Sequence, residues 1–204
     1  MKRNRWLKPL VFLAALLPVA LLAYRGFMAD LGANPIEEIT HQTGWWTLTF
    51  LLITLSVTPL RKLTKQYWLI QYRRMLGLFA FFYGTLHLMT YLWLDQFFDF
   101  SAILKDVYKR PFITAGFTAF VLMVPLALTS TKWAIRKLGP RWQALHRLIY
   151  FSALAGVIHY IWLVKKDIRE PLIYLAIFAV LMLFRFGTWI APRLGRSSPA
   201  VPAD

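Results

Sequence analysis

The chain of 204 residues contains no cysteine and only nine acidic residues, and both shortages narrow what it can be. Without cysteine there is no disulfide, no cysteine-ligated zinc, no iron–sulfur cluster and no thiol nucleophile. The ten glycines are scattered and form no G-x-G-x-x-G loop, so a nucleotide-binding domain of that type is excluded. Charged residues make up 16% of the chain, below the roughly 25% of an average soluble domain, whereas 58% are hydrophobic. This composition predicts an integral membrane protein.

Six apolar stretches approach the length of about 20 residues that a helix needs to cross a bilayer. They run from Leu10 to Tyr24, Trp45 to Leu60, Met75 to Leu94, Pro111 to Thr131, Leu148 to Val164 and Pro171 to Trp189. The first is short and follows a basic segment, but no small-x-small cleavage site comes after it, so we expect a spanning helix rather than a signal peptide. The predicted fold class is an all-α integral membrane protein with six transmembrane helices. No internal repeat is evident.

The 24 lysines and arginines divide unevenly between the two sides of this predicted bundle. Seventeen lie in the N-terminal segment, the second-to-third and fourth-to-fifth connections and the C-terminal end, where Asp204 is the only acid. The remaining connections hold seven basic residues and eight acids. The positive-inside rule therefore places both termini in the cytoplasm, and it attributes the net charge of +15 to topology and lipid contacts rather than to nucleic acid. We expect one transmembrane domain over residues 1–192 and a disordered cytoplasmic tail over residues 193–204.

Two of the four histidines, His87 and His159, fall inside predicted helices that run in the same direction. At 1.5 Å per residue, His87 lies ~12 Å and His159 ~9 Å below the same boundary of the membrane, so the two imidazoles reach a similar depth. Each has a glycine one turn away on the same face, Gly84 and Gly156, and a missing side chain leaves room for a flat macrocycle. Two neutral imidazoles that face each other are what a bis-histidine b-type haem requires, whereas zinc sites need three or four ligands. The alternative is two unrelated histidines, each hydrogen-bonded to a neighbouring helix.

A third histidine, His146, is predicted at the basic interface, where Arg73 and Arg74 reach the same level from another helix. These three side chains could hold an anionic group such as a flavin phosphate, a haem propionate or a reduced quinone oxygen. The alternative is ordinary positive-inside charge in contact with lipid phosphates. His146 stays open between a haem ligand and a contact where electrons enter. We expect His41 in a water-exposed loop, and we expect Arg185 to extend toward the nearby interface.

The segments that carry these residues resemble the MsrQ (YedZ) family. That family comprises the haem-binding membrane subunits of the bacterial periplasmic methionine-sulfoxide reductase system, a branch of the ferric-reductase-like transmembrane superfamily. The similar segments are Gln71 to Gly77, Gly84 to Leu88, Arg141 to His146 and Ile158 to Trp162, with Thr58 to Leu60 and Thr129 to Thr131. Each motif is short, but together they are specific, and the resemblance extends from the first helix to about Arg185.

The resemblance implies a six-helix protein of the bacterial inner membrane that binds haem b and flavin mononucleotide (FMN). Such proteins take electrons from the quinone pool, or from a cytoplasmic flavin reductase, and deliver them to a periplasmic molybdopterin-containing subunit that reduces methionine sulfoxide. The important histidines of the family match His87, His146 and His159, and its paired arginines match Arg73 and Arg74. The chain would then be an electron conduit, and the sulfoxide chemistry would occur on the partner.

Two other functions remain as alternatives. A small histidine-dependent transporter would use the buried imidazoles as proton relays, and it predicts further ionisable residues in mid-membrane. The nine acids instead lie in the predicted connections or at the C-terminus, which weighs against it. A cofactor-free assembly subunit is the second alternative, and it leaves the repeated Gly-x-x-His pattern unexplained.

Overall fold

The computed structural model describes residues 6–194, with side chains as far as Thr188. In chain order the elements are α1 (Leu7–Phe27), α2 (Pro35–Thr64), η1 (Tyr67–Tyr72), α3 (Arg73–Met89), η2 (Thr90–Asp95), α4 (Phe100–Lys109), α5 (Pro111–Leu128), α6 (Lys132–Leu138), α7 (Pro140–Leu145), α8 (Leu148–Leu163) and α9 (Arg169–Leu194). Six stretches are long and apolar enough to cross a membrane: α1, α2, η1 to η2, α5, α7 with α8, and α9 as far as Thr188. The predicted six-helix membrane protein is confirmed. Most of the tail predicted over residues 193–204 lies outside the described residues, which end within it at residue 194.

Two predicted loops are in fact helical, and local capping explains both. Helix α2 begins at Pro35 because Asn34 accepts a hydrogen bond from the amide of Glu37 and proline favours the first helical position. His41 therefore lies within α2 rather than in a loop, although it is exposed as expected. Helix α4 begins where the Asp99 carboxylate accepts the first free amides, and it interrupts the long connection predicted between the third and fourth spans.

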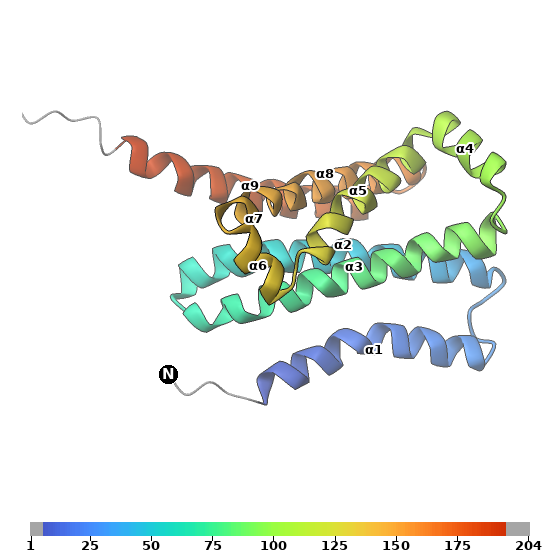
Figure 1. Cartoon of the computed structure of the whole chain (residues 1–204). Coiled ribbons are helices and arrows are strands. Elements are labelled where there is room, and N and C mark those ends of the chain that lie inside the picture. Colours follow the sequence, from blue (N-terminus) through green and yellow to red (C-terminus); the bar gives the residue numbers. More distant parts are fainter. Residues whose placement is uncertain (1–5, 195–204) are drawn as a thin grey trace, which may run out of the picture.

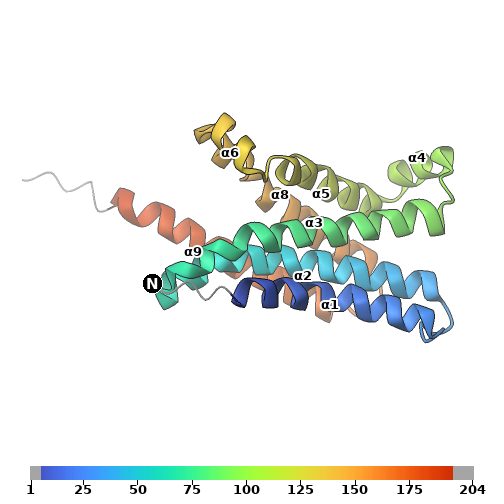
Figure 2. The ribbon, with the colours of Figure 1, turned by 60° about the horizontal axis from the view of Figure 1, so that its bottom comes forward.

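The spanning helices form two tightly packed antiparallel pairs, α2 with α3 and α5 with α8. Figure 1 shows the α2–α3 pair in the middle of the bundle, with α5, α8 and α9 on one side and α1 on the other. In Figure 2 α1 runs along the α2–α3 pair, whereas α6 lies at the periphery. The buried core is centred on the middle of α2, around Leu51 and Leu55, and on Phe79, Ala80 and Tyr83 of α3.

Tyr83 secures α1 to this core at a bend. Pro18 interrupts the hydrogen bonds of α1, and the Tyr83 hydroxyl occupies the gap beside it. The hydroxyl donates to the carbonyl of Ala15 (2.8 Å) and accepts from the amide of Val19 (3.2 Å), two groups that would bond to each other in a regular helix. An inserted side chain thus stabilises the bend at Pro18, and α1 changes direction along its length (Figure 1).

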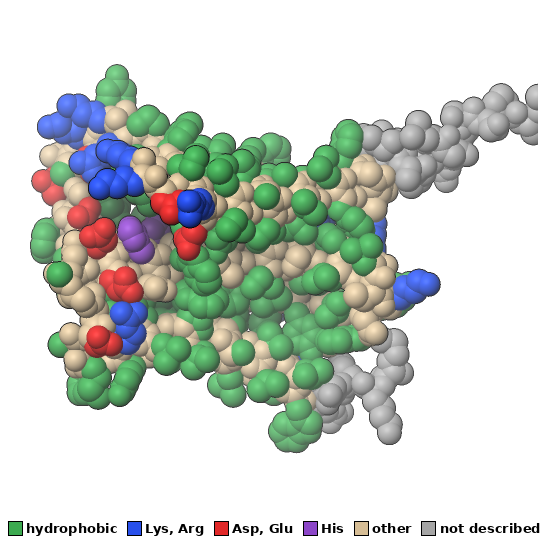
Figure 3. Space-filling view, turned by 180° about the vertical axis from the view of Figure 1, so that it is seen from behind, with side chains coloured by type: hydrophobic (Ala, Val, Ile, Leu, Met, Phe, Trp, Pro, Cys, Tyr) green, Lys and Arg blue, Asp and Glu red, His purple; other side chains and the backbone are tan. Residues whose placement is uncertain are grey.

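The two ends of the bundle differ sharply in charge. We call one end of the bundle the acidic end; there α1 connects to α2, α3 to α5 and α8 to α9. This end carries all eight acidic residues of the described part of the chain. Its four ion pairs are Arg25–Asp30, Arg25–Glu38, Arg110–Asp106 and Arg169–Asp167. At the basic end, α2 connects to α3 and α5 to α8, and residues 6–194 contribute lysines and arginines there but no acid. Figure 3 shows an apolar belt between the ends, with the acidic side chains gathered at one of them.

Candidate functional site

His87 of α3 and His159 of α8 meet inside the bundle, toward the acidic end. Their ring centroids are 6.0 Å apart, with an angle of 75° between the ring planes. The two residues were predicted at similar depth, and the structure places their rings side by side. Neither side chain is exposed.

Each of these rings is held by a backbone carbonyl of the helix paired with its own. His87 Nδ1 lies 2.9 Å from the carbonyl oxygen of Thr40 on α2, and His159 Nδ1 lies 2.6 Å from that of Phe112 on α5. A carbonyl oxygen only accepts hydrogen bonds, so each Nδ1 is the protonated donor. The lone pair of each neutral ring is therefore on Nε2, the arrangement that most metal-ligating histidines adopt.

Two glycines that the sequence did not single out allow the rings to lie where they do. A Cβ atom on Gly44 would come within 2.9 Å of His87 Cε1, and one on Gly116 within 2.9 Å of His159 Nδ1. Contacts that short do not occur for real Cβ atoms, so any larger residue would push the rings aside. Gly44 and Gly116 are thus part of the site.

The two halves of the site repeat one another. An offset of 72 residues relates the two halves: Thr40 corresponds to Phe112, Gly44 to Gly116 and His87 to His159. In both sets, the glycine lies one turn after the residue whose carbonyl binds the ring. The helix pairs α2–α3 and α5–α8, the two hairpins of the bundle, therefore orient their histidines in the same way, because the first helix of each pair holds the ring that the second supplies. The correspondence lies in the spacing of these residues, and it is not evident from overall sequence similarity.

The glycines predicted to lie beside a haem, Gly84 and Gly156, also follow this offset. In the structure, the nearest atoms to a Cβ on Gly84 belong to Met123 and Thr47, and a Cβ on Gly156 would meet Leu48. Both positions are close contacts between helices. Their role in haem packing stays a prediction.

The two rings lie close enough together to bind one group between them, since their centroids are 6.0 Å apart. Residues 6–194 contain no group of three or more His, Cys, Asp or Glu side chains that could hold a metal ion alone. Two histidines without a third protein ligand fit a macrocycle-bound iron, because the porphyrin supplies the remaining ligands.

At the basic end, the His146 ring is oriented like those of His87 and His159, with its Nδ1 facing a backbone carbonyl. Its Nδ1 lies 3.0 Å from the carbonyl oxygen of Trp142, and its ring stacks on the Trp142 indole with centroids 3.8 Å apart. Its Nε2 is buried and has no hydrogen-bond partner. Arg73 is half-buried and close enough to interact electrostatically with His146, whereas Arg74 is exposed. Arg73 thus lies within electrostatic range of His146, whereas Arg74 faces outward.

Arg185 is the clearest correction among the polar residues. Instead of extending to the interface, its guanidinium turns into the bundle, where Nη1 donates to the Tyr150 hydroxyl (2.9 Å) and Nη2 to the carbonyl of Leu55 (2.7 Å). The acceptor on Leu55 is 130 positions away in the sequence, so hydropathy alone could not reveal it.

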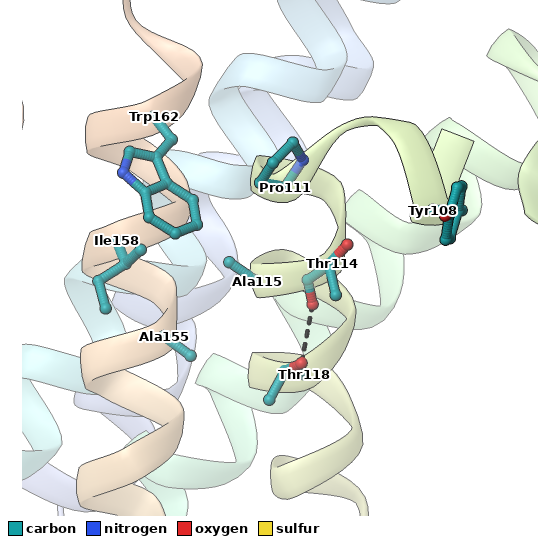
Figure 4. A pocket seen from close by; sticks show the side chains of 8 residues that line it. All are labelled: Tyr108, Pro111, Thr114, Ala115, Thr118, Ala155, Ile158 and Trp162. Atoms are coloured by element: carbon teal, nitrogen blue, oxygen red, sulfur yellow. Dashed lines mark hydrogen bonds between the residues drawn. The ribbon is translucent and has the colours of Figure 1, made fainter. Parts of the chain in front are cut away.

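A shallow groove of about 390 Å³ runs along α5 and α8 (Figure 4). Its lining residues are Tyr108, Pro111, Thr114, Ala115, Thr118, Ala155, Ile158 and Trp162. Both threonine hydroxyls donate to backbone carbonyls, those of Val107 and Thr114, so they are already satisfied. The groove therefore offers an apolar surface suited to a lipid chain rather than to catalysis.

Comparison with known proteins agrees with this arrangement. Residues 43–157 match the family model described as ferric reductase like transmembrane component. This segment begins one residue before Gly44 and ends two residues before His159, so it includes most of both hairpins. No solved structure matches the chain.

Three bacterial relatives carry the name protein-methionine-sulfoxide reductase heme-binding subunit MsrQ. The protein from Herminiimonas arsenicoxydans is 56% identical over 187 residues, which cover 90% of this chain and 86% of the relative. The protein from Azospira oryzae is 56% identical over 181 residues, with 88% and 78% covered. The protein from Bordetella pertussis is 50% identical over 185 residues, with 90% of each chain covered.

Proposed function

The chain belongs to the family of MsrQ heme-binding subunits, within the ferric reductase like transmembrane components, and on this premise we propose that it is an electron-transferring cytochrome b subunit of the bacterial inner membrane. In this proposal it takes electrons from the quinone pool or from a cytoplasmic flavin reductase. It passes them through haem b to a periplasmic molybdopterin-containing subunit that reduces methionine sulfoxide in oxidised proteins. Both termini lie in the cytoplasm, as the charge distribution predicts.

The observation that carries the proposal is the pair of adjacent imidazoles, with ring centroids 6.0 Å apart. His87 and His159 would hold the iron of haem b as axial ligands, since each has its Nδ1 bound to a carbonyl and its Nε2 free to ligate. When bound, the haem supplies a one-electron carrier whose potential is set by its axial ligands and its apolar surroundings. The chain's own contribution is to orient both rings and exclude water from them. Gly84 and Gly156 would provide room for the macrocycle.

Electron uptake is proposed at the basic end. FMN or a quinone would bind there, with Arg73 and Arg74 contacting its anionic group and His146 serving as a contact or as a ligand of a further haem. The unpartnered Nε2 of His146 and the nearby charge of Arg73 support this assignment.

The partner subunit is proposed to dock at the acidic end, on the connection from Asp95 to Arg110. Helix α4 lies there and exposes Phe100, Leu104 and Tyr108 along one stripe. This end is also the nearer one to His87 and His159, so the electron's final step to the partner would be short.

The alternatives account for less of the structure. A histidine-dependent transporter needs ionisable residues along a path through the membrane, yet the eight acids of the described chain all lie at one end. A cofactor-free assembly subunit gives no reason for two histidines fixed by repeated carbonyl and glycine contacts.

The test is a reduced-minus-oxidised visible spectrum of the detergent-purified protein, produced with haem supplied, and an assay of flavin extracted from the same sample. We expect sharp low-spin cytochrome b bands, and their loss in His87→Ala and in His159→Ala. His41→Ala is the matched control, because His41 is exposed on α2, and it should keep the bands. A colourless wild-type protein, or low-spin haem retained in both variants, contradicts the proposed site.

A further inference from the structure

Helix α4 has a wider apolar face than the bundle covers. Ile103 is buried against neighbouring helices, and Val107 is half-buried. Phe100, Leu104 and Tyr108 continue this apolar face at helical spacing, yet they are 71%, 71% and 90% exposed. We call these three residues the α4 stripe. A line of large exposed apolar side chains marks contact with another molecule or with lipid.

The polar side of α4 borders this stripe and carries positive charge. Ser101, Lys105 and Lys109 are exposed and follow one another by four residues, so they form a second line along the helix. Asp106, the acid of α4, pairs with Arg110 (3.4 Å), and none of the ion pairs found in residues 6–194 includes either lysine. An apolar face with lysines along its border is typical of helices that lie in a membrane interface.

The two helices that α4 connects end at different depths. His159 Nδ1 lies 2.6 Å from the carbonyl oxygen of Phe112, so the first turn of α5 is level with the histidine pair. On the other side of α4, α3 and η2 continue for eight residues beyond His87, or ~12 Å, as far as Asp95. Helix α4 therefore fills the space between the outer ends of the spanning helices and the level of the histidines.

A sharp turn brings α4 back alongside η2. Phe97 (φ 47°) and Phe98 (φ 59°) both adopt the left-handed conformation, and the amide of Phe98 donates to the carbonyl of Leu92 (2.8 Å). The Tyr91 hydroxyl donates to the Asp106 carboxylate (3.3 Å), which ties α4 to η2. In both Figure 1 and Figure 2, α4 lies beside the acidic-end part of the bundle and does not extend beyond the neighbouring helices. It thus lies at the depth of the outer part of the spanning segments.

The α4 stripe is continuous with the outer surface of α5 and α8. Tyr108 also lines the groove along these helices, together with Pro111 and Trp162 (Figure 4). Both helices belong to segments that are long and apolar enough to cross a membrane, and Trp162 lies near the end of α8, where tryptophan is typical of the interface. The stripe and the groove therefore face the same surroundings, which are the lipids of the bilayer.

We infer that α4 is an interfacial helix, whose stripe inserts among the acyl chains of the leaflet at the acidic end while Lys105 and Lys109 extend to the lipid phosphates. The occupant of the exposed stripe is thus phospholipid rather than protein. The inference goes beyond the proposed function, because it would hold even if neither haem nor a partner bound. It leaves the polar side of α4 to the partner subunit that is proposed to dock on this connection.

The test uses the lack of cysteine, because a single introduced cysteine is then the only thiol of the chain. Full-length Leu104→Cys and Lys105→Cys proteins are placed in nanodiscs of phosphatidylcholine and phosphatidylglycerol, and their reaction with a water-soluble, membrane-impermeant maleimide is followed. The two positions are sequence neighbours, and both are exposed on the protein itself. We expect Leu104→Cys to react about tenfold or more slowly, since its side chain is withdrawn from water by lipid.

A second pair, Phe100→Cys and Ser101→Cys, repeats the comparison one turn earlier and should give the same difference. After denaturation in sodium dodecyl sulfate the members of each pair should react equally fast, which shows that lipid and not the local sequence caused the difference.

Equal rates for both members of each pair in nanodiscs would overturn the interfacial placement, because the stripe would then face water. Visible spectra of the same samples distinguish this result from failure of the proposed function, since missing haem bands concern only the histidine pair.

Discussion

The acidic and basic ends are built from the same helices, yet they meet their polar requirements in different ways. At the acidic end, carboxylates pair with arginines, and the Nδ1 atoms of His87 and His159 are bound by carbonyls. At the basic end, five buried polar atoms lack partners within the described chain. One end therefore holds its two histidine rings in place by hydrogen bonds within the chain, whereas the other leaves buried side-chain atoms without such partners in the described residues. We therefore expect substitutions at one end to leave the other end unchanged.

The largest expected effect comes from filling the space that keeps the acidic-end rings in position. Gly44→Ala and Gly116→Ala each introduce a Cβ within 2.9 Å of a histidine ring, and such overpacking typically costs about 1–3 kcal/mol. We expect haem affinity to fall by roughly tenfold or more in each variant. The measurement is haem content per protein, with the low-spin electron paramagnetic resonance signal as a second readout, because tilted rings change that signal even where haem remains.

Gly77→Ala is the control for this comparison. Gly77 lies on α3 with His87, but a Cβ there would meet Thr54 at an ordinary distance of 3.5 Å. The Gly77→Ala variant should keep both its haem content and its low-spin electron paramagnetic resonance signal. If both histidine-facing variants behaved like this control, the acidic end would not be the preorganised site that the comparison describes.

A smaller effect, confined to the basic end, is expected from His146→Ala. The variant should keep the haem at His87 and His159 but slow its reduction by quinol, by roughly ten- to a hundredfold if one hydrogen bond to a charged group is lost. Stopped-flow reduction followed at the haem bands measures this. Loss of haem absorbance instead would make His146 a ligand, and the two ends would then resemble each other.

The smallest effect concerns Asp99, at the surface of the acidic end. Its ionised carboxylate accepts the amides of Ala102 and Ser101, and these hydrogen bonds lower its pKa. A lowered pKa means that the carboxylate stabilises α4 above the ordinary pKa of about 4 and that this contribution disappears as the pH falls further. We expect α4 amides to lose protection a few-fold in Asp99→Ala at neutral pH.

Hydrogen exchange, corrected for intrinsic rates, measures this loss, and the haem spectrum should not change. Asp99→Asn keeps an acceptor for the cap and should remove most of the acid sensitivity. Acid sensitivity of α4 that persists in both variants would assign it to another group.

The sequence predicted what depends on hydropathy and depth. Six apolar stretches became six spanning segments, and counting residues from the charged boundaries placed His87 and His159 at one level. The residues at which the helices begin were harder to predict. Asn34-Pro35 before α2 and Asp99 before α4 are recognisable caps, but each lies in a polar segment that otherwise resembles a loop.

Contacts between segments far apart in the sequence could not be predicted from hydropathy and depth. The direction of Arg185 depends on a carbonyl that α2 presents 130 positions earlier, and an arginine near a helix end equally suits the interface. Gly44 and Gly116 did leave a signal, because each precedes its histidine by 43 residues. That equality becomes meaningful only once the structure shows that each glycine lies against its histidine ring.

The matching helix pairs have a consequence for how the protein is made. Each histidine is oriented by a carbonyl of its own helix pair, so an inserted α2–α3 unit would already hold His87 in place before α5 and α8 follow. Association of the two units in the bilayer would then bring the two rings together without either unit refolding. A haem that joins them would act as a cross-link between two separately inserted parts, so its capture would mark the completion of biogenesis.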